Sequence, residues 1–342
     1  MVITMRRYVP LVLAAAFVLT TAATTAVAQD RLGSIALKPK IDGRDRAKIS
    51  TEVSERVKKL ADAGTDSDQR RAARERLLGT PGLKTATKEF KAVYAETCAR
   101  ELSPLATSEV FETGFDAVMV LSSLNQVKTN ETLAAALKSV HAATRLRAVR
   151  GLQALHKELA ADPKLAKPVL RALGEAGAKE TQTPVLRIIY QTIDLGSEAK
   201  DDQLADDCAQ ALNAILVSRL ERLNTGRRDE MVDERALEAA ARYYAGASEA
   251  QKKQLIDNLA NCLRHAVDRY FAADTAEGYL PTLASLATKA EDAIHEMIKA
   301  SKARVPDKKV ADSLKKAGQK AQAQAALDEL RAVLKGEPWN LP

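Results

Sequence analysis

The chain has 342 residues, of which only 4% are aromatic and 11 are proline, while Ala, Leu, Lys, Arg and Glu dominate. Such a mixture favours helix at most positions, and no alternating apolar and polar run bounded by turn residues indicates a strand. The net charge is +7, but residues 29–80 hold 13 basic against 9 acidic residues, so the remaining body is nearly neutral. A nucleic-acid footprint is a clustered basic patch, and this distribution therefore makes nucleic acid a poor partner for the helical body.

The N-terminus has the three parts of a secretory signal. Arg6 and Arg7 form the positive region, residues 11–18 are an unbroken apolar run, and Ala26-Val27-Ala28 is a small-x-small cleavage site. The sequence therefore predicts a signal peptide over 1–28, cleaved after Ala28, and a secreted or periplasmic mature chain. Threonines interrupt the apolar stretch, which disfavours a permanent span, so no membrane span is expected after cleavage. The Arg pair leaves Sec and twin-arginine export as alternatives.

Residues 29–82 are predicted to form an N-terminal leader and two short helices. A flexible leader is expected over 29–41. The first helix is indicated by apolar residues at helical spacing, namely Ile49, Val53, Val57 and Leu60. The second runs from Asp66 through Leu78, where Gly79-Thr80-Pro81-Gly82 stops it. Two further helices are predicted over 84–102, ended by Ser103-Pro104, and over 109–125.

The segment 129–155 carries the most informative pattern. One helix is predicted through Leu133–Val140, a short connection follows at 141–143, and a second helix begins with Thr144-Arg145-Leu146-Arg147-Ala148-Val149-Arg150-Gly151-Leu152. This order, a β-branched residue and Arg followed by small residues, resembles a HEAT repeat. The resemblance implies that the small residues let the two helices approach closely and that Arg145 bonds to the turns of neighbouring repeats.

A second, weaker copy follows, with helices predicted over 165–173 and 183–193. Arg187 stands 42 residues after Arg145, within the 40–47 residue period of such arrays, and the resemblance implies the same structural role for both arginines. Tyr190 and Gln191 replace the expected small residues. A single hairpin cannot bury its own apolar stripe. The sequence therefore predicts an all-α fold, a HEAT-like or armadillo-like α-α superhelix of stacked hairpins over 83–300, although the helices after Gly196 show no clean repeat.

Residues 301–342 are predicted to form a long C-terminal helix and a tail. The helix is expected to start at Asp307 and to run through Leu334, and its Ala-, Lys- and Gln-rich first half favours an exposed element. Trp339 lies in the tail. A large aromatic side chain is costly to leave in water, so it is expected to dock on the body.

No catalytic, cofactor or metal site is predicted. The chain has four histidines, interpreted as solvated or helix-capping, and His295-Glu296 lacks the second His of a zincin helix. The cysteines are interpreted as buried small apolar residues, with one disulfide and one free thiol as the alternative; they are Cys98, Cys208 and Cys262.

Three further groups have plain structural interpretations. Acidic residues at a helix start are favoured by the helix dipole, which explains Asp201, Asp202, Asp206 and Asp207; a calcium loop is the weaker alternative because its Gly turn is missing. The segment Gly174-Glu175-Ala176-Gly177 fits the C-terminus of a helix better than a phosphate cradle. A group of arginines at a helix end is interpreted as a solvated run favoured by the helix dipole; it consists of Arg219, Arg222, Arg227 and Arg228.

The candidate partner-binding residues are Arg147, Arg150 and Arg171, expected to form a basic stripe along the inner surface of the solenoid. Together these features predict an exported, non-catalytic helical-repeat protein that acts as a scaffold or protein-binding module in the periplasm or at the cell exterior, with another protein as its partner. Two alternatives stay open. One is an enzyme, or an enzyme subunit, with an unfamiliar site. The other is a binder of polyanions or of the envelope surface through residues 29–80.

Overall fold

A computed structural model describes residues 32–62, 66–79, 85–195, 202–223, 225, 230–314 and 319–341. The predicted signal peptide, 1–28, lies outside the described residues. The chain divides into two compact units, Met1–Leu105 and Ala106–Pro342. Gly79–Gly82, where the predicted N-terminal region ends, falls inside the first unit, and the predicted division at 82/83 stays a prediction.

The helices of the first unit are α2 (Gly33–Ala36), α3 (Gly43–Asp62), α4 (Ser67–Gly79) and α5 (Lys88–Ala106). The expectation of a flexible leader over 29–41 is wrong for its described part, because Leu32 and Ile35 are buried and the Thr87 N–H donates to Ala36 O at 2.8 Å. The predicted break at Ser103-Pro104 is also wrong, since α5 continues to Ala106.

Two buried polar side chains bind the end of α4 to its neighbours. Arg56, on α3, donates from Nη1 to the carbonyl of Arg76 at 2.7 Å. Tyr94, on α5, donates from its hydroxyl to the carbonyl of Leu77 at 2.7 Å. The last carbonyls of a helix have no partner within it, so these two bonds both satisfy α4 and link three helices.

Most helices of the second unit form two stacks, here called ladders. Ladder A consists of α7 (Asn130–Ala136), α10 (Pro163–Lys179), α12 (Asp202–Leu223), α14 (Glu249–Tyr270) and α17 (Lys320–Lys335). Ladder B consists of α6 (Phe111–Leu124), α8 (Ala142–Gln153), α11 (Thr183–Ile193), α13 (Glu234–Tyr243) and α15 (Leu280–Ala300). The remaining helices are the short α9 (His156–Ala161) and α16 (Val310–Ser313), and the 3-10 turns η1 (Val127–Thr129), η3 (Glu230–Asp233) and η4 (Glu277–Tyr279).

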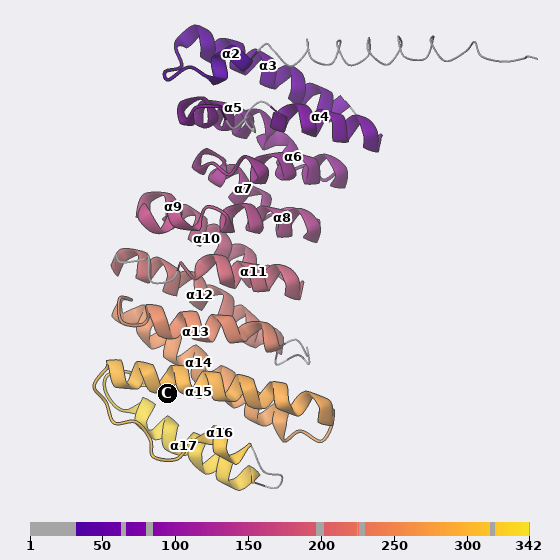
Figure 1. Cartoon of the computed structure of the whole chain (residues 1–342). Coiled ribbons are helices and arrows are strands. Elements are labelled where there is room, and N and C mark those ends of the chain that lie inside the picture. The colour runs from indigo at the N-terminus through magenta and orange to yellow at the C-terminus, as the bar shows by residue number, and fades with distance from the viewer. Residues whose placement is uncertain are drawn as a thin grey trace, which may run out of the picture. The chain divides into compact units, whose positions relative to one another are not determined.

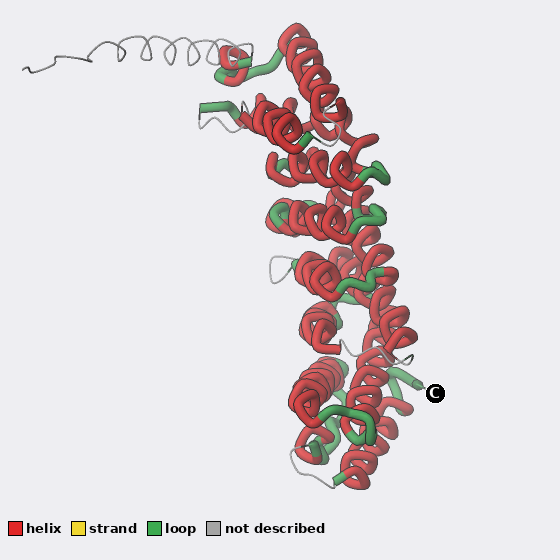
Figure 2. The backbone as a smooth tube through the Cα atoms, turned by 90° about the vertical axis from the view of Figure 1, so that its right-hand side faces the viewer, coloured by secondary structure: helices red, strands yellow, loops and turns green. Residues whose placement is uncertain are grey.

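Each helix of a ladder packs against the next helix of the same ladder, and the pairs α7/α8, α10/α11, α12/α13 and α14/α15 also pack across (Figures 1 and 2). This arrangement is an α-α solenoid, and the prediction of an all-α fold built from stacked helical hairpins is confirmed. The ladders also continue through α12–α15, where the sequence shows no clean repeat.

Glycines allow successive helices of a ladder to approach closely. A Cβ atom added to Gly151 of α8 would lie 2.8 Å from Ser122 Cβ of α6, and one added to Gly174 of α10 would lie 3.1 Å from Ala211 Cα of α12. Both distances are shorter than ordinary van der Waals contact, so a larger residue would force the neighbouring helix to shift. The expected close approach at Gly151 is confirmed. The segment Gly174-Glu175-Ala176-Gly177 belongs to the C-terminal part of α10, which ends at Lys179, and the carbonyl of Gly177 accepts the N–H of the C-cap residue Glu180, as expected for a helix end.

The C-terminal region differs from its prediction. The single helix expected from Asp307 through Leu334 is replaced by α16 and α17, with residues 315–318 outside the described residues. The expected exposure holds for Ala321, Gln322, Gln324 and Ala325. It is wrong for Ala323 and Ala326, which are buried on the face of α17, a helix that packs on α14 and α16. Small side chains allow helices to approach, which is why an Ala-rich segment can be an interface. Among the described residues, no helix combines the length and the apolar character needed to cross a lipid bilayer.

The tail docks on the body as predicted. Trp339 is buried, and its Nε1 donates to the hydroxyl of Tyr244 at 2.6 Å. Lys253 donates from Nζ to the carbonyl of Asn340 at 3.2 Å. The tail is therefore held near the junction of α13 and α14 by Tyr244 and Lys253.

Candidate binding surfaces

Arg145 joins the first hairpin to the next repeat. Its Nε and Nη2 donate to Glu180 Oε2 and Oε1 at 2.7 and 2.9 Å, and its Nη1 donates to the carbonyls of Ser139 and Val140. Burial of Glu180 opposes ionisation, but the hydrogen bonds from Arg145 and from backbone N–H groups at the start of α11 outweigh it, and they lower the pKa of this carboxyl. The structural role expected for Arg145 is confirmed.

Arg187 does not have the same role. It is exposed, whereas Leu186 beside it is buried. The reason is register: Arg145 lies four residues after the N-cap His141 of α8, but Arg187 lies five residues after the N-cap Gln182 of α11. One residue turns a side chain by about 100° around a helix of 3.6 residues per turn, so Arg187 faces outward.

The three arginines predicted as a partner-binding stripe lie on two helices. Arg147 and Arg150 are on α8 of ladder B, where Arg147 donates from Nε to Ser122 Oγ at 2.7 Å and Arg150 is exposed. Arg171 is on α10 of ladder A and pairs with Glu175 one turn later at 3.1 Å. Arg187 lies on α11, which packs directly on α8. Arg150 and Arg187 are therefore exposed on neighbouring helices of ladder B.

A buried charge network replaces part of the arginine run that was expected to be solvated. The Arg219 side chain is 1% exposed, and its Nε donates to both oxygens of Asp233, at 3.2 and 3.0 Å. The Tyr190 hydroxyl donates to the same carboxylate at 2.9 Å. Arg222 donates from Nη1 to the carbonyl of Ala178. The interpretation is therefore wrong for these two arginines, while Arg227 and Arg228 lie outside the described residues.

This network also explains Tyr190. A small residue was expected at its position, and the tyrosine weakens the repeat pattern in the sequence. In the structure Tyr190 is fully buried, and its hydroxyl reaches the carboxylate of Asp233 in the next hairpin. The departure from the repeat pattern is thus the place where α11, α12 and η3 are joined by hydrogen bonds.

The acidic cluster at the start of α12 is used between helices. Asp206 accepts the N–H of Ser248, the N-cap residue of α14, at 2.8 Å, and Asp207 lies 3.5 Å from Lys167 Nζ of α10. Asp201 and the side chain of Asp202 lie outside the described residues. Across the described ranges, no group of three or more His, Cys, Asp or Glu is placed to hold a metal ion.

The three cysteines are free thiols and all are buried, as the sequence predicted. Burial in an apolar environment raises the pKa of each thiol. A thiol with a raised pKa is protonated near neutral pH and is a poor nucleophile.

The histidines only partly follow their predicted solvated or capping roles. The rings of His141 and His156 lie within hydrogen-bond distance of backbone carbonyls. His265 and His295 are buried instead, at 8% and 5% exposure, and burial lowers the pKa of His295.

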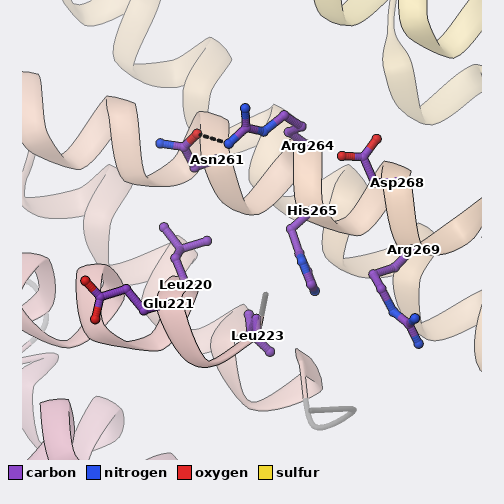
Figure 3. A pocket seen from close by; sticks show the side chains of 8 residues that line it. All are labelled: Leu220, Glu221, Leu223, Asn261, Arg264, His265, Asp268 and Arg269. Carbon is purple, nitrogen blue, oxygen red and sulfur yellow. Dashed lines mark hydrogen bonds between the residues drawn. The ribbon is translucent and has the colours of Figure 1, made fainter. Parts of the chain in front are cut away.

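A pocket of about 550 Å³ lies between the end of α12 and the second half of α14 (Figure 3). Leu220 and Leu223 line it from α12, while the His265 ring extends toward Leu223 from α14 (Figure 3). Arg269 also lines it from α14. Arg264 and Asn261 also line the pocket, and Arg264 donates from Nη2 to Asn261 Oδ1 at 2.9 Å. The lining thus combines two leucines with both signs of charge. The sequence analysis missed this pocket, although polar residues recur at helical spacing over 261–269.

No known family matches the sequence, and no curated protein does. Among solved structures, the chain is similar to the designed armadillo repeat protein YIII(Dq)4CqI, with 15% identity over 82% of this chain and 100% of that chain and a TM-score of 0.36. An engineered protein shares 17% identity over 82% of this chain and 96% of its own, with a TM-score of 0.32. A computationally designed self-assembling cyclic homo-oligomer shares 16% identity over 85% and 94%, with a TM-score of 0.23. These TM-scores are low, so the description of the fold rests on the helix ladders themselves.

Proposed function

We propose that this protein is an exported, non-catalytic scaffold that binds another protein in the periplasm or at the cell exterior. One observation carries the binding part of the proposal. The adjacent helices α8 and α11 contain four arginines and no acidic residue, and after Arg145 is committed to Glu180 the other three, Arg147, Arg150 and Arg187, are wholly or partly exposed on neighbouring rungs. A stacked array displays such a surface over several repeats.

Export is tested with the first 28 residues fused to an alkaline phosphatase that is active only outside the cytoplasm. We expect activity, and we expect a mature N-terminus at Gln29 when the full chain is sequenced after expression in a bacterial host. Replacement of Arg6 and Arg7 by lysine separates the two routes, because twin-arginine export requires the arginine pair and Sec export requires only positive charge. Retention of the phosphatase in the cytoplasm would remove export from the proposal.

Partner binding is tested by affinity capture with residues 29–342 from the envelope fraction of the source organism, followed by mass spectrometry. A protein recovered in stoichiometric amount by the wild type supports a scaffold. Recovery of no protein under several salt conditions, together with turnover of a small molecule, would instead favour the enzyme alternative. The pocket between α12 and α14 is the candidate site for that alternative, and its test is the variant His265→Ala, which should abolish such turnover.

A further inference from the structure

We infer that the exposed surface of α8 and α11 binds an acidic polypeptide segment. This surface is called the arginine face and is defined by Arg147, Arg150 and Arg187. The inference rests on the proposed protein-binding function and names the chemistry of the partner.

The arginine face is a local concentration of positive charge. Neither α8 nor α11 contains Asp or Glu, although the body of the chain is close to neutral. Within the described part of the chain, Arg150 and Arg187 form no hydrogen bond or ion pair. Several arginines elsewhere in the second unit are paired with carboxylates, for example Arg171 with Glu175 and Arg235 with Glu238.

Packing brings the guanidinium groups onto one surface. Arg147 and Arg150 are three residues apart on α8, and Arg187 and Gln191 are four residues apart on α11, so each pair shares a helix face. Gln153 donates from Nε2 to Gln191 Oε1 at 3.4 Å, which places the two faces side by side. Packed helices are about 8–10 Å apart, a distance that an extended chain covers in about three residues.

The edges of the arginine face are defined by neighbouring contacts. On the α6 side, Ser122 and Ser123 accept hydrogen bonds from Arg147 at 2.7 and 3.0 Å and orient its guanidinium. On the α13 side, Arg242 pairs with Asp194. Positive charge without a carboxylate partner is therefore concentrated on α8 and α11, two neighbouring helices of ladder B.

The chemistry fits a polypeptide carboxylate better than a nucleic acid. A guanidinium binds a carboxylate through two parallel N–H donors, and the side chains of Gln153 and Gln191 offer amide groups suited to a peptide backbone. Single-stranded nucleic acids also need aromatic platforms for base stacking. Helix α8 has no aromatic residue, and the one on α11, Tyr190, is buried.

The test uses residues 29–342 and a short fluorescent peptide of alternating Glu and Ser, with binding measured by anisotropy at low salt. The wild type should bind this peptide more tightly than a matched Lys and Ser peptide. The variant Arg150→Glu/Arg187→Glu should weaken binding by about tenfold, because two ion pairs are replaced by repulsion. The matched control Lys164→Glu/Arg171→Glu, which reverses two exposed charges on α10 of ladder A and so changes the net charge equally, should leave binding within about twofold. Both variants change exposed side chains, and an unchanged circular dichroism melt verifies their folding.

Two outcomes of the binding assay overturn the inference, and affinity capture supplies a third. Equal weakening by Lys164→Glu/Arg171→Glu and by Arg150→Glu/Arg187→Glu would mean that only net charge matters. Tighter binding of a single-stranded oligonucleotide than of the Glu peptide, lost in the double variant, would assign the arginine face to nucleic acid. The proposed scaffold function is judged separately by affinity capture. A partner recovered equally by the wild type and by Arg150→Glu/Arg187→Glu would support the scaffold and exclude the arginine face as its binding site. Binding of the Glu peptide without any captured partner would support the arginine face as a binding site and count against the scaffold.

Discussion

Removal of one charge from the Arg219–Asp233 pair should be among the most destabilising single changes in the second unit. Each side chain is 1% exposed, and Asp233→Ala leaves a buried guanidinium without its carboxylate and the Tyr190 hydroxyl without its acceptor. Breaking a buried ion pair costs about 3–5 kcal/mol. With a urea dependence of about 3 kcal/mol/M, the midpoint of unfolding should fall by roughly 1–1.7 M.

A double-mutant cycle separates this explanation from a simple loss of packing. The variant Arg219→Met/Asp233→Leu removes both charges while keeping much of the buried volume, so it should cost clearly less than the sum of Arg219→Met and Asp233→Leu, with a coupling energy of about 2–3 kcal/mol. Arg171→Ala is the exposed control, because its pair with Glu175 is 82% and 52% exposed and should be worth about 0.2–0.5 kcal/mol. A midpoint for Asp233→Ala no lower than that of Arg171→Ala, or strictly additive costs in the cycle, would refute the reasoning.

Four further changes test other parts of the structure. The pKa of Glu180 lies below its ordinary value of 4.5, so its ion pair with Arg145 stabilises the fold fully above pH 4.5 and this contribution is lost as the pH falls below it; thermal melts of the wild type and Glu180→Gln should differ at neutral pH and converge in acid. Gly151→Ala places a Cβ 2.8 Å from Ser122 Cβ and should cost about 1–3 kcal/mol, whereas Gly278→Ala, which meets nothing within 4 Å, should be close to neutral in the same urea titration. Tyr244→Phe removes the acceptor of the single tryptophan and should weaken docking of the tail by about 1–3 kcal/mol, seen as stronger acrylamide quenching of Trp339 fluorescence; unchanged quenching would show that packing alone holds the tail. The three cysteines are buried with raised thiol pKa values, so a thiol reagent should react slowly with the native chain and rapidly in urea, and fast reaction in buffer would contradict their burial.

Features that depend on near neighbours in the sequence were predictable. Helix content follows from residue propensities, and the first hairpin is recognisable because Arg145, Ala148 and Gly151 stand at the spacing that close packing needs. Burial of the three cysteines follows in the same way from the apolar registers in which they occur. These signals lie within one or two helical turns, so the tertiary structure adds little to them.

Features that depend on distant partners could not be read from the sequence. Arg219 resembles a solvated helix-end arginine until the fold brings Asp233 against it. Arg187 matches the repeat period, but a shift of one residue relative to the helix start turns it outward and places it beside Arg150. The Ala-rich segment of α17 looks exposed throughout, but α17 packs on α14 and α16, and Ala323 and Ala326 are buried. In each case the local pattern is compatible with both burial and exposure, and only the packing of the helices decides between them. The reason is that desolvation and pairing of a side chain depend on which side chains the neighbouring helices contribute.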